Sequence, residues 1–245
     1  MKSVDIAVPV YYGNIPQIEE SVKKQITAYK KIIRNYNWNI VLAINGPDKG
    51  ITDFAKKVVG KYENVKYTYT PVAGKGAGIK NCWRLSKADI VAYTDVDLSA
   101  GIESFTELIE AVSKDYDLAL GSKYLTGSEI RRVNKRDLIS RIYHTFFTKI
   151  FIGIRTSDVH CGLKALKKDS FDKILPFVKD NQWFFDTELM FFATKSNFLI
   201  KEVPVIWTDS GLPSGVKIYR TAIKFIWKII EMKFRFALNR DKIKS

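Results

Sequence analysis

The sequence has few of the residues that build disulfide frameworks or zinc sites. It contains two cysteines and two histidines in 245 residues, and Cys82 and Cys161 lack C-x-x-C spacing. Neither a disulfide framework nor a zinc site is therefore expected. No apolar run reaches the roughly 18 residues of a spanning helix, and no charged and then apolar leader ends at a cleavage site. We expect a protein of a reducing, cytoplasmic setting without a spanning helix or a secretory signal.

Positive charge is abundant, at a formal net charge of +14 and a pI near 9.6. A charge of this size indicates an anionic partner, and nucleic acid, acidic lipid and nucleotide diphosphate all qualify. The excess lies after residue 120, in Arg131-Arg132, Lys135-Arg136 and the tail. With 46% hydrophobic residues the chain can build a sizeable core, so we expect a globular protein.

Apolar strand-like segments alternate with amphipathic helical segments along the first half of the chain. Strands are predicted at 4–10, 39–44, 65–70, 90–95 and 117–121, and helices at 15–36, 52–61, 76–86 and 104–114. This alternation predicts an α/β fold with a mostly parallel central sheet and helices on both faces. No repeat or low-complexity linker interrupts the pattern, so we expect one domain over 1–215 followed by a tail over 216–245.

Two further helices are predicted in the second half, and both have wide apolar faces. One covers 138–151, and the other covers 218–238, where a narrow charged stripe faces a broad apolar and aromatic surface. Packing against the sheet or a second subunit is one interpretation. The other is a helix in the membrane interface, with aromatics at the acyl boundary and basic residues at anionic headgroups.

Two carboxylates follow the apolar strand at 90–94. Asp95 and Asp97 alternate with Val96, so on an extended strand their side chains leave the same face. Paired carboxylate oxygens suit Mg²⁺ or Mn²⁺ that bridges substrate phosphates. A second copy of the pattern, Asp115 and Asp117, precedes a strand instead of following one. Ligands bind beyond the carboxyl ends of strands, which favours the first copy and makes the second a solvated turn.

A glycine-rich turn, Gly74-Lys75-Gly76-Ala77-Gly78, lies between the strand at 65–70 and the next helix. It matches neither the Walker A pattern nor G-x-G-x-x-G. Glycines allow close approach of a ligand, a helix N-terminus attracts phosphate, and Lys75 adds positive charge. Two interpretations are possible, an ordinary loop or a segment that contacts phosphate. Its position just before the strand that leads to Asp95 favours the phosphate contact.

Seven ordered blocks carry a family resemblance. They are AVPVY at 7–11, GKG at 74–76, DVD at 95–97, GSKY at 121–124, DVHCGLK at 158–164, WFFDTEL at 183–189 and EVPVIW at 202–207. In this order they resemble family 2 glycosyltransferases. More narrowly they resemble polyprenyl-phosphate sugar transferases of the dolichyl-phosphate β-glucosyltransferase and dolichyl-phosphate mannose synthase type, with the glucosyl branch the nearer.

The resemblance implies a GT-A fold and inverting transfer of a hexose to a polyprenyl phosphate. It also implies Mg²⁺ or Mn²⁺, a nucleotide-sugar donor with UDP-glucose favoured over GDP-mannose, and peripheral contact with the cytoplasmic face of a membrane. Nucleic acid is not an expected partner, and a homo-oligomer stays open. By position, metal ligands would be Asp95 and Asp97; catalytic residues would be Asp95, Asp97, Arg136, Arg141 and Asp186; donor contacts would be Pro9, Tyr11, Asn45, Gly74, Lys75, Asp95 and Lys123. Asp158 and Glu188 match further acidic positions of the family.

Three positions depart from the family pattern. Asn45 stands where such enzymes often carry an aspartate for the nucleoside, Lys123 where arginine is common, and Ser99 where mannose synthases tend to place a metal-ligating glutamine. Donor recognition and the metal shell are the properties that these departures affect.

The implied chemistry needs few protein groups. A lipid monophosphate is largely anionic at neutral pH, since its second pKa is about 6, so it can attack the anomeric carbon without a strong base. Lys75 and a metal at Asp97 would neutralise the departing diphosphate, while Arg136 and Arg141 suit the acceptor phosphate.

Two alternatives remain open from the sequence. The first is a soluble family 2 glycosyltransferase that acts on a saccharide or protein hydroxyl, with Asp186 or Glu188 as general base. The second is a non-catalytic basic protein that binds lipid or nucleic acid, which leaves the paired carboxylates unexplained.

Overall fold

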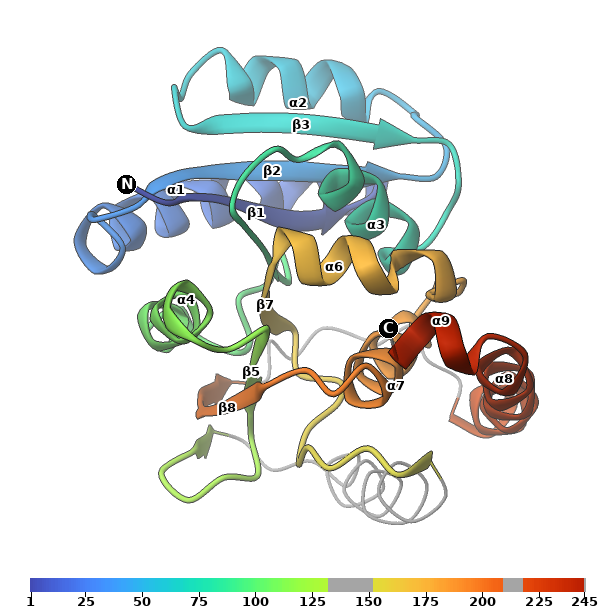
Figure 1. The fold of residues 1–245 in the computed structure, drawn as a ribbon. Helices are drawn as coiled ribbons and strands as arrows, with labels where there is room; N and C mark the ends of the chain where they lie inside the picture. The colour runs from blue at the N-terminus through green and yellow to red at the C-terminus, as the bar shows by residue number, and fades with distance from the viewer. Residues whose placement is uncertain (132–151, 209–217, 245) are drawn as a thin grey trace.

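The computed structural model describes residues 1–131, 152–208 and 218–244 (Figure 1). The strands are β1 (Ser3–Val10), β2 (Asn37–Asn45), β3 (Val65–Thr70), β4 (Ile90–Thr94), β5 (Leu118–Ser122), β6 (Glu129–Arg131), β7 (Leu163–Lys167), β8 (Ile200–Pro204) and β9 (Ile206–Thr208). The helices are α1 (Ile15–Ile32), α2 (Ile51–Val59), α3 (Lys75–Leu85), α4 (Phe105–Lys114), α6 (Lys168–Ile174), α7 (Phe185–Lys195), α8 (Ile218–Leu238) and α9 (Arg240–Lys244), with short 3₁₀ turns η1 (Tyr12–Asn14) and η3 (Leu175–Phe177).

Seven strands form the central sheet in the order β3-β2-β1-β4-β7-β5-β8. Every neighbouring pair is parallel except those of β7, which runs antiparallel to both β4 and β5. A small second sheet pairs β6 with β9. The predicted α/β fold with a mostly parallel sheet is confirmed.

Strand alternation divides the core between the two faces of the sheet. One face buries the even residues of β1 under α1, α2 and α4. The other face buries Ala7, Val91 and Tyr93 under α3, α6 and α7, with Ile229 and Met232 of α8 at its edge. Figure 1 shows α3 and α6 in front of the sheet. Both faces are covered, which explains why β1, β2 and β4 read as nearly continuous apolar runs.

Most element boundaries lie within two residues of the prediction. The first helix is the exception, since α1 ends at Ile32 and not at Tyr36; a turn closed by the Tyr36 N–H donating to Ile33 O leads directly into β2. Strands β6, β7, β8 and β9 and helices α6, α7 and α9 were not predicted. In β7, Lys164 interrupts the apolar pattern that marks a buried strand. The helix predicted at 138–151 lies outside the described residues. Among the described helices, none combines the length and the apolar character needed to cross a membrane.

Candidate active site

The predicted site residues gather where β1, β2 and β4 reach their carboxyl ends. Tyr11 follows β1, Asn45 ends β2, Asp95 and Asp97 follow β4, and Lys75 begins α3. These strands are parallel neighbours, so their carboxyl ends meet at one edge of the sheet, the usual ligand position in an open α/β sheet.

The two carboxylates of the D-x-D pattern lie in a turn. Strand β4 ends at Thr94, and the Leu98 N–H donates to Asp95 O at 3.0 Å, with Leu98 in the left-handed region at φ 56°. The prediction that they share one face of an extended strand is therefore wrong. Asp97 is exposed, and its Oδ1 accepts a hydrogen bond from the Ser99 N–H at 3.1 Å. The turn leaves Asp97 open to solvent at the rim while Asp95 points inward.

Lys75 is the direct partner of Asp95. Its Nζ lies 2.8 Å from Asp95 Oδ1 and 3.8 Å from Asp186 Oδ2, and its side chain is only 8% exposed. Burial opposes the charge of this ammonium, but the two carboxylates outweigh it and raise the pKa of Lys75. For Asp95, desolvation with the nearby charges of Asp97 and Asp186 outweighs Lys75, so the pKa of Asp95 is raised. Burial is thus the main reason that the ionised form of Asp95 is disfavoured, and Lys75 offsets part of that cost.

Beneath this pair lies a second, fully buried lysine. Lys164 Nζ is 2.8 Å from Asp186 Oδ1 and donates to Cys161 O at 2.8 Å and to the Tyr93 hydroxyl at 3.0 Å. The Tyr93 hydroxyl in turn donates to Asp186 Oδ1. Burial raises the pKa of Asp186, but Lys164 and Lys75 outweigh it and lower that pKa to about 2. Asp186 is thus a permanently ionised counter-charge for both lysines.

Two glycines allow the backbone to approach these side chains. A Cβ on Gly162 would lie 1.9 Å from Asp95 Oδ2, so only glycine leaves room for that carboxylate. Gly74 has a φ of +130°, and a Cβ there would lie 2.0 Å from Asn181 O. Both positions require glycine for steric reasons, and Gly74 also for its backbone conformation.

Asn45 connects the first strand to the glycine-rich turn. Its Nδ2 donates to Val10 O and its Oδ1 accepts from the Gly74 N–H, both at 2.9 Å. The Asn45 side chain is buried, and both its amide nitrogen and its amide oxygen are hydrogen-bonded within the protein. It therefore holds the glycine-rich turn against β1, in addition to its predicted role as a donor contact. Pro9 lies within β1, and Tyr11 is exposed beside it.

Lys123 lies at the carboxyl end of β5. Its N–H donates to Asp158 Oδ2 at 3.2 Å, and its Nζ lies 4.7 Å from the centre of the Trp207 ring. Asp158 is fully buried. The predicted acceptor residues Arg136 and Arg141 lie outside the described residues.

The donor set fits a hard divalent cation with few protein ligands. Within the described ranges no group of three or more histidine, cysteine, aspartate or glutamate side chains is placed to hold a metal. Asp95 and Asp97 offer carboxylate oxygens, which are the ligands that a hard divalent cation prefers. The pKa of Asp95 is raised mainly by burial and to a smaller extent by the nearby charges of Asp97 and Asp186. A cation there would need substrate oxygens or water for the rest of its shell.

The second D-x-D copy has a different environment. Asp115 is exposed, as predicted for a solvated turn. Asp117 is partly exposed, and it is also bound: its Oδ1 accepts from the Ser170 hydroxyl and its Oδ2 from the Leu199 N–H, both at 2.9 Å. This copy is a structural tie between α6 and β8.

Sequence reasoning gave no role to Lys164 and Tyr93, which complete the buried network. Lys164 is fully buried in β7, between apolar neighbours in the chain. A lysine inside a short apolar strand signals a buried acidic partner, because an unpaired buried ammonium is costly. Only the fold shows that this partner is Asp186.

Comparisons with known proteins agree with this arrangement. The model of the family described as Glycosyl transferase family 2 matches residues 5–175. A Dictyostelium discoideum protein named dolichyl-phosphate beta-glucosyltransferase is 25% identical over 259 residues, which cover 99% of this chain and 77% of that one. Glycosyltransferase AglD of Haloferax volcanii is 26% identical over 210 residues, and the match covers 85% of this chain but only 33% of that relative's length.

A solved structure shares the fold. Glucosyl-3-phosphoglycerate synthase from Mycobacterium tuberculosis, in complex with Mn²⁺, UDP and glucosyl-3-phosphoglycerate, superposes with a TM-score of 0.62 at 12% identity. The match covers 98% of this chain and 80% of that one. The likeness confirms the predicted GT-A architecture.

We predict that Asp97→Asn lowers metal-dependent turnover by at least about 100-fold and leaves unfolding by urea unchanged, because Asp97 is exposed and one of the two proposed metal ligands. Asp115→Asn, in the exposed second copy of the pattern, is the matched control and should keep wild-type turnover. Turnover of Asp97→Asn within about threefold of wild type at saturating Mn²⁺ contradicts the assignment.

We predict that Lys164→Met costs about 3 kcal/mol of unfolding free energy, because it leaves Asp186 buried beside an incomplete network. Lys167→Met on the same strand removes a half-exposed lysine and should cost less than about 1 kcal/mol. Urea unfolding at neutral pH measures both. Equal losses in the two variants would show that the buried network does not contribute as described.

Proposed function

The chain belongs to glycosyl transferase family 2, and from that premise we propose that it is an inverting, metal-dependent hexosyltransferase. The proposed donor is a nucleotide diphosphate sugar, with UDP-glucose favoured over GDP-mannose, and the proposed acceptor is a polyprenyl phosphate. The relative named dolichyl-phosphate beta-glucosyltransferase supports this acceptor class.

The state of the two candidate bases is the observation that favours a phosphate acceptor. A hydroxyl acceptor requires a general base, whose efficiency is greatest when its pKa is near the working pH. The pKa of Asp186 is lowered to about 2, with Lys164 and Lys75 as its partners. Glu188 is 2% exposed and bound through Oε1 to Arg235 at 2.8 Å. Asp186 is therefore a poor proton acceptor, and both oxygens of Glu188 are occupied by Arg235 and by loop amides. A lipid phosphate needs no base.

The residues around the donor would supply charge and orientation. A divalent cation held by Asp95 and Asp97 would add positive charge at the departing diphosphate. Lys75, at the first position of α3, places an ammonium and a helix N-terminus at the same point. Lys123 contributes a second cation across the site. The structural relative bound to Mn²⁺ and UDP supports a donor of this class.

The experiment for the proposed function is transfer from a panel of labelled nucleotide sugars to a polyprenyl phosphate, followed by extraction into organic solvent. We expect label in the organic phase only with both Mn²⁺ or Mg²⁺ and the lipid phosphate. We also expect kcat/KM for the lipid to rise as the pH passes about 6, the second pKa of a phosphate monoester, with no inflection from Asp186. Transfer to a free saccharide or to a protein hydroxyl, with none to the lipid, would overturn the proposed acceptor.

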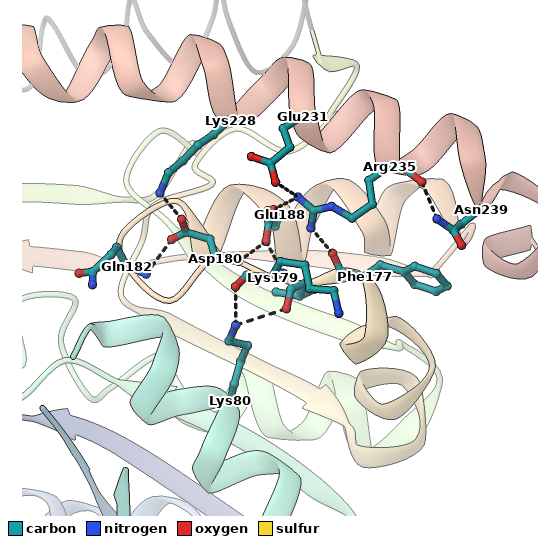
Figure 2. A network of polar contacts seen from close by, with 11 residues as sticks. Lys80, Phe177, Lys179, Asp180, Gln182, Glu188, Lys228, Glu231, Arg235 and Asn239 are labelled. Atoms are coloured by element: carbon teal, nitrogen blue, oxygen red, sulfur yellow. Dashed lines mark hydrogen bonds and ion pairs between the residues drawn. The ribbon is translucent and has the colours of Figure 1, made fainter. Parts of the chain in front are cut away.

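Helix α8 supports peripheral membrane contact, although two residues of its predicted charged stripe, Lys228 and Arg235, point the opposite way from the expectation. Lys228 and Arg235 were expected at anionic headgroups, and instead they turn inward and pair with Asp180 and Glu188 (Figure 2). The outward surface includes an apolar row, formed by Trp227, Ile230, Phe234 and Leu238, which are 54–69% exposed and recur at helical spacing. We call this row the apolar stripe. Glu231 and Lys233 are exposed on the same helix.

We propose that the apolar stripe lies in the interface of the membrane that holds the lipid acceptor, on its cytoplasmic face. Exposed aromatics on one helix face suit the boundary between headgroups and acyl chains. The net charge of +14 adds attraction to anionic lipid. Attachment through another subunit of the same chain is the competing arrangement, and it requires no lipid.

We predict that the double variant Trp227→Ser, Phe234→Ser binds anionic vesicles at least about tenfold more weakly than wild type, because it removes two aromatic groups from the apolar stripe. Leu85→Ser, which changes an equally exposed apolar residue at the end of α3, is the control. Flotation with vesicles of phosphatidylglycerol and phosphatidylcholine measures binding. Equal flotation of both variants and wild type would exclude the stripe as the membrane contact.

A further inference from the structure

We propose that α8 positions the glycine-rich turn at 74–78, which consists of Gly74 and the start of α3. It does so through the connection at 178–184, and Lys228 and Arg235 are the positioning residues. Figure 2 shows side chains of α8 reaching inward to this connection, and Lys80 of α3 reaching it from the opposite side. The inference rests on the proposed function for the ligand of the turn, a nucleotide diphosphate. The mechanical part, from α8 to the turn, stands on contacts alone.

The first link joins α8 to two buried carboxylates. Lys228 forms an ion pair with Asp180, whose side chain is 7% exposed. Arg235 uses both of its terminal nitrogens: Nη2 donates to Glu188 Oε1 at 2.8 Å and Nη1 donates to Phe177 O at 2.7 Å. Two pairs, seven residues apart on one face of the helix, fix both its position along the connection and its rotation.

The second link holds the backbone of the connection. Glu188 Oε2 accepts hydrogen bonds from the Lys179 and Asp180 N–H groups, both at 2.6 Å. Asp180 Oδ1 accepts from the Gln182 N–H at 2.7 Å. Asp180 and Glu188 each bind α8 through one carboxylate oxygen and accept hydrogen bonds from loop amides through the other. The same two carboxylates therefore hold both α8 and the loop.

The third link joins the connection to the glycine-rich turn. Asn181 O accepts from the Ala77 N–H at 3.0 Å, and the Gln182 side chain donates to Ala73 O at 2.7 Å. The contact is so close that a Cβ on Gly74 would lie 2.0 Å from Asn181 O. The turn is thus held from outside by the connection, and from inside by Asn45.

The orientation of α8 distinguishes positioning from simple packing. A helix that only covers a core buries apolar residues and exposes its charges. Helix α8 does bury Ile229 and Met232, and it exposes Glu231 and Lys233. It differs from such a helix because Lys228 and Arg235 turn inward into ion pairs while Trp227 and Phe234 remain exposed. Desolvating charged groups costs free energy that hydrophobic packing would not, and directional ion pairs give a unique placement in return. Through the connection and the glycine-rich turn, the position of α8 would therefore also determine the position of Lys75, one residue beyond Gly74.

The test compares Lys228→Met and Arg235→Met with the conservative Lys228→Arg and with Lys233→Met, an exposed lysine on the same helix. Hydrogen exchange of the free chain reports the turn at 74–78, and exchange within β4 reports global stability. Isothermal titration in Mn²⁺ with UDP and GDP measures affinity for whichever nucleotide wild type binds more tightly. Steady-state kinetics in the labelled lipid assay separates KM for the donor from kcat.

We expect both methionine variants to speed exchange at 74–78 at least about fivefold with β4 unchanged. Nucleotide affinity should fall about three- to tenfold, with donor KM raised by a similar factor and kcat changed less than about twofold. Lys228→Arg and Lys233→Met should match wild type. Unchanged exchange at 74–78 overturns the mechanical link, and faster exchange with unchanged affinity overturns its role in donor binding. If wild type binds neither nucleotide, the proposed function fails, while the exchange data still decide the link from α8 to the turn.

Discussion

The site depends on charge balance between two carboxylates and two lysines at the carboxyl end of the sheet. Asp186 lies between Lys164 and Lys75, and Lys75 reaches on to Asp95. Lys164, Asp186 and Lys75 are buried, and a buried charge is costly without its counter-charge, whereas Asp95 is partly exposed. The chain of pairs therefore holds β4, β7, α3 and α7 in one arrangement, and it leaves the carboxylate of Asp97 free to face solvent.

This balance also determines what the site is suited to do. A carboxylate paired with two lysines is a poor proton acceptor, which supports the proposed acceptor, a phosphate that is already ionised. Lys75 is committed to the carboxylates and is placed at a helix N-terminus, where a phosphate adds a further counter-charge. Family membership and the GT-A fold agree with such a donor site. The acceptor proposal follows from the chemistry of the carboxylates and not from the fold.

Helix α8 contacts the connection next to the site on its inner side and is exposed on its outer side. Its inward charges hold the connection at 178–184, and its outward aromatics form the apolar stripe. One helix thus carries both the proposed membrane contact and a set of contacts that lead to the glycine-rich turn. If the proposed link holds, a membrane surface that stabilises the observed position of α8 would also stabilise the glycine-rich turn, and nucleotide binding at the turn would in return stabilise α8.

The sequence by itself determined the strands and helices of the first half, the location of Asp95 and Asp97 after the fourth strand, and the family blocks, because these depend on local periodicity and on short motifs. It did not reveal β7, since Lys164 breaks the apolar pattern that marks a buried strand. It also predicted Lys228 and Arg235 of α8 at anionic headgroups on the outside. Only the tertiary structure decided both points, because the partners of Lys164, Lys228 and Arg235 are distant in sequence, and a buried charge is recognised only when its counter-charge is in place.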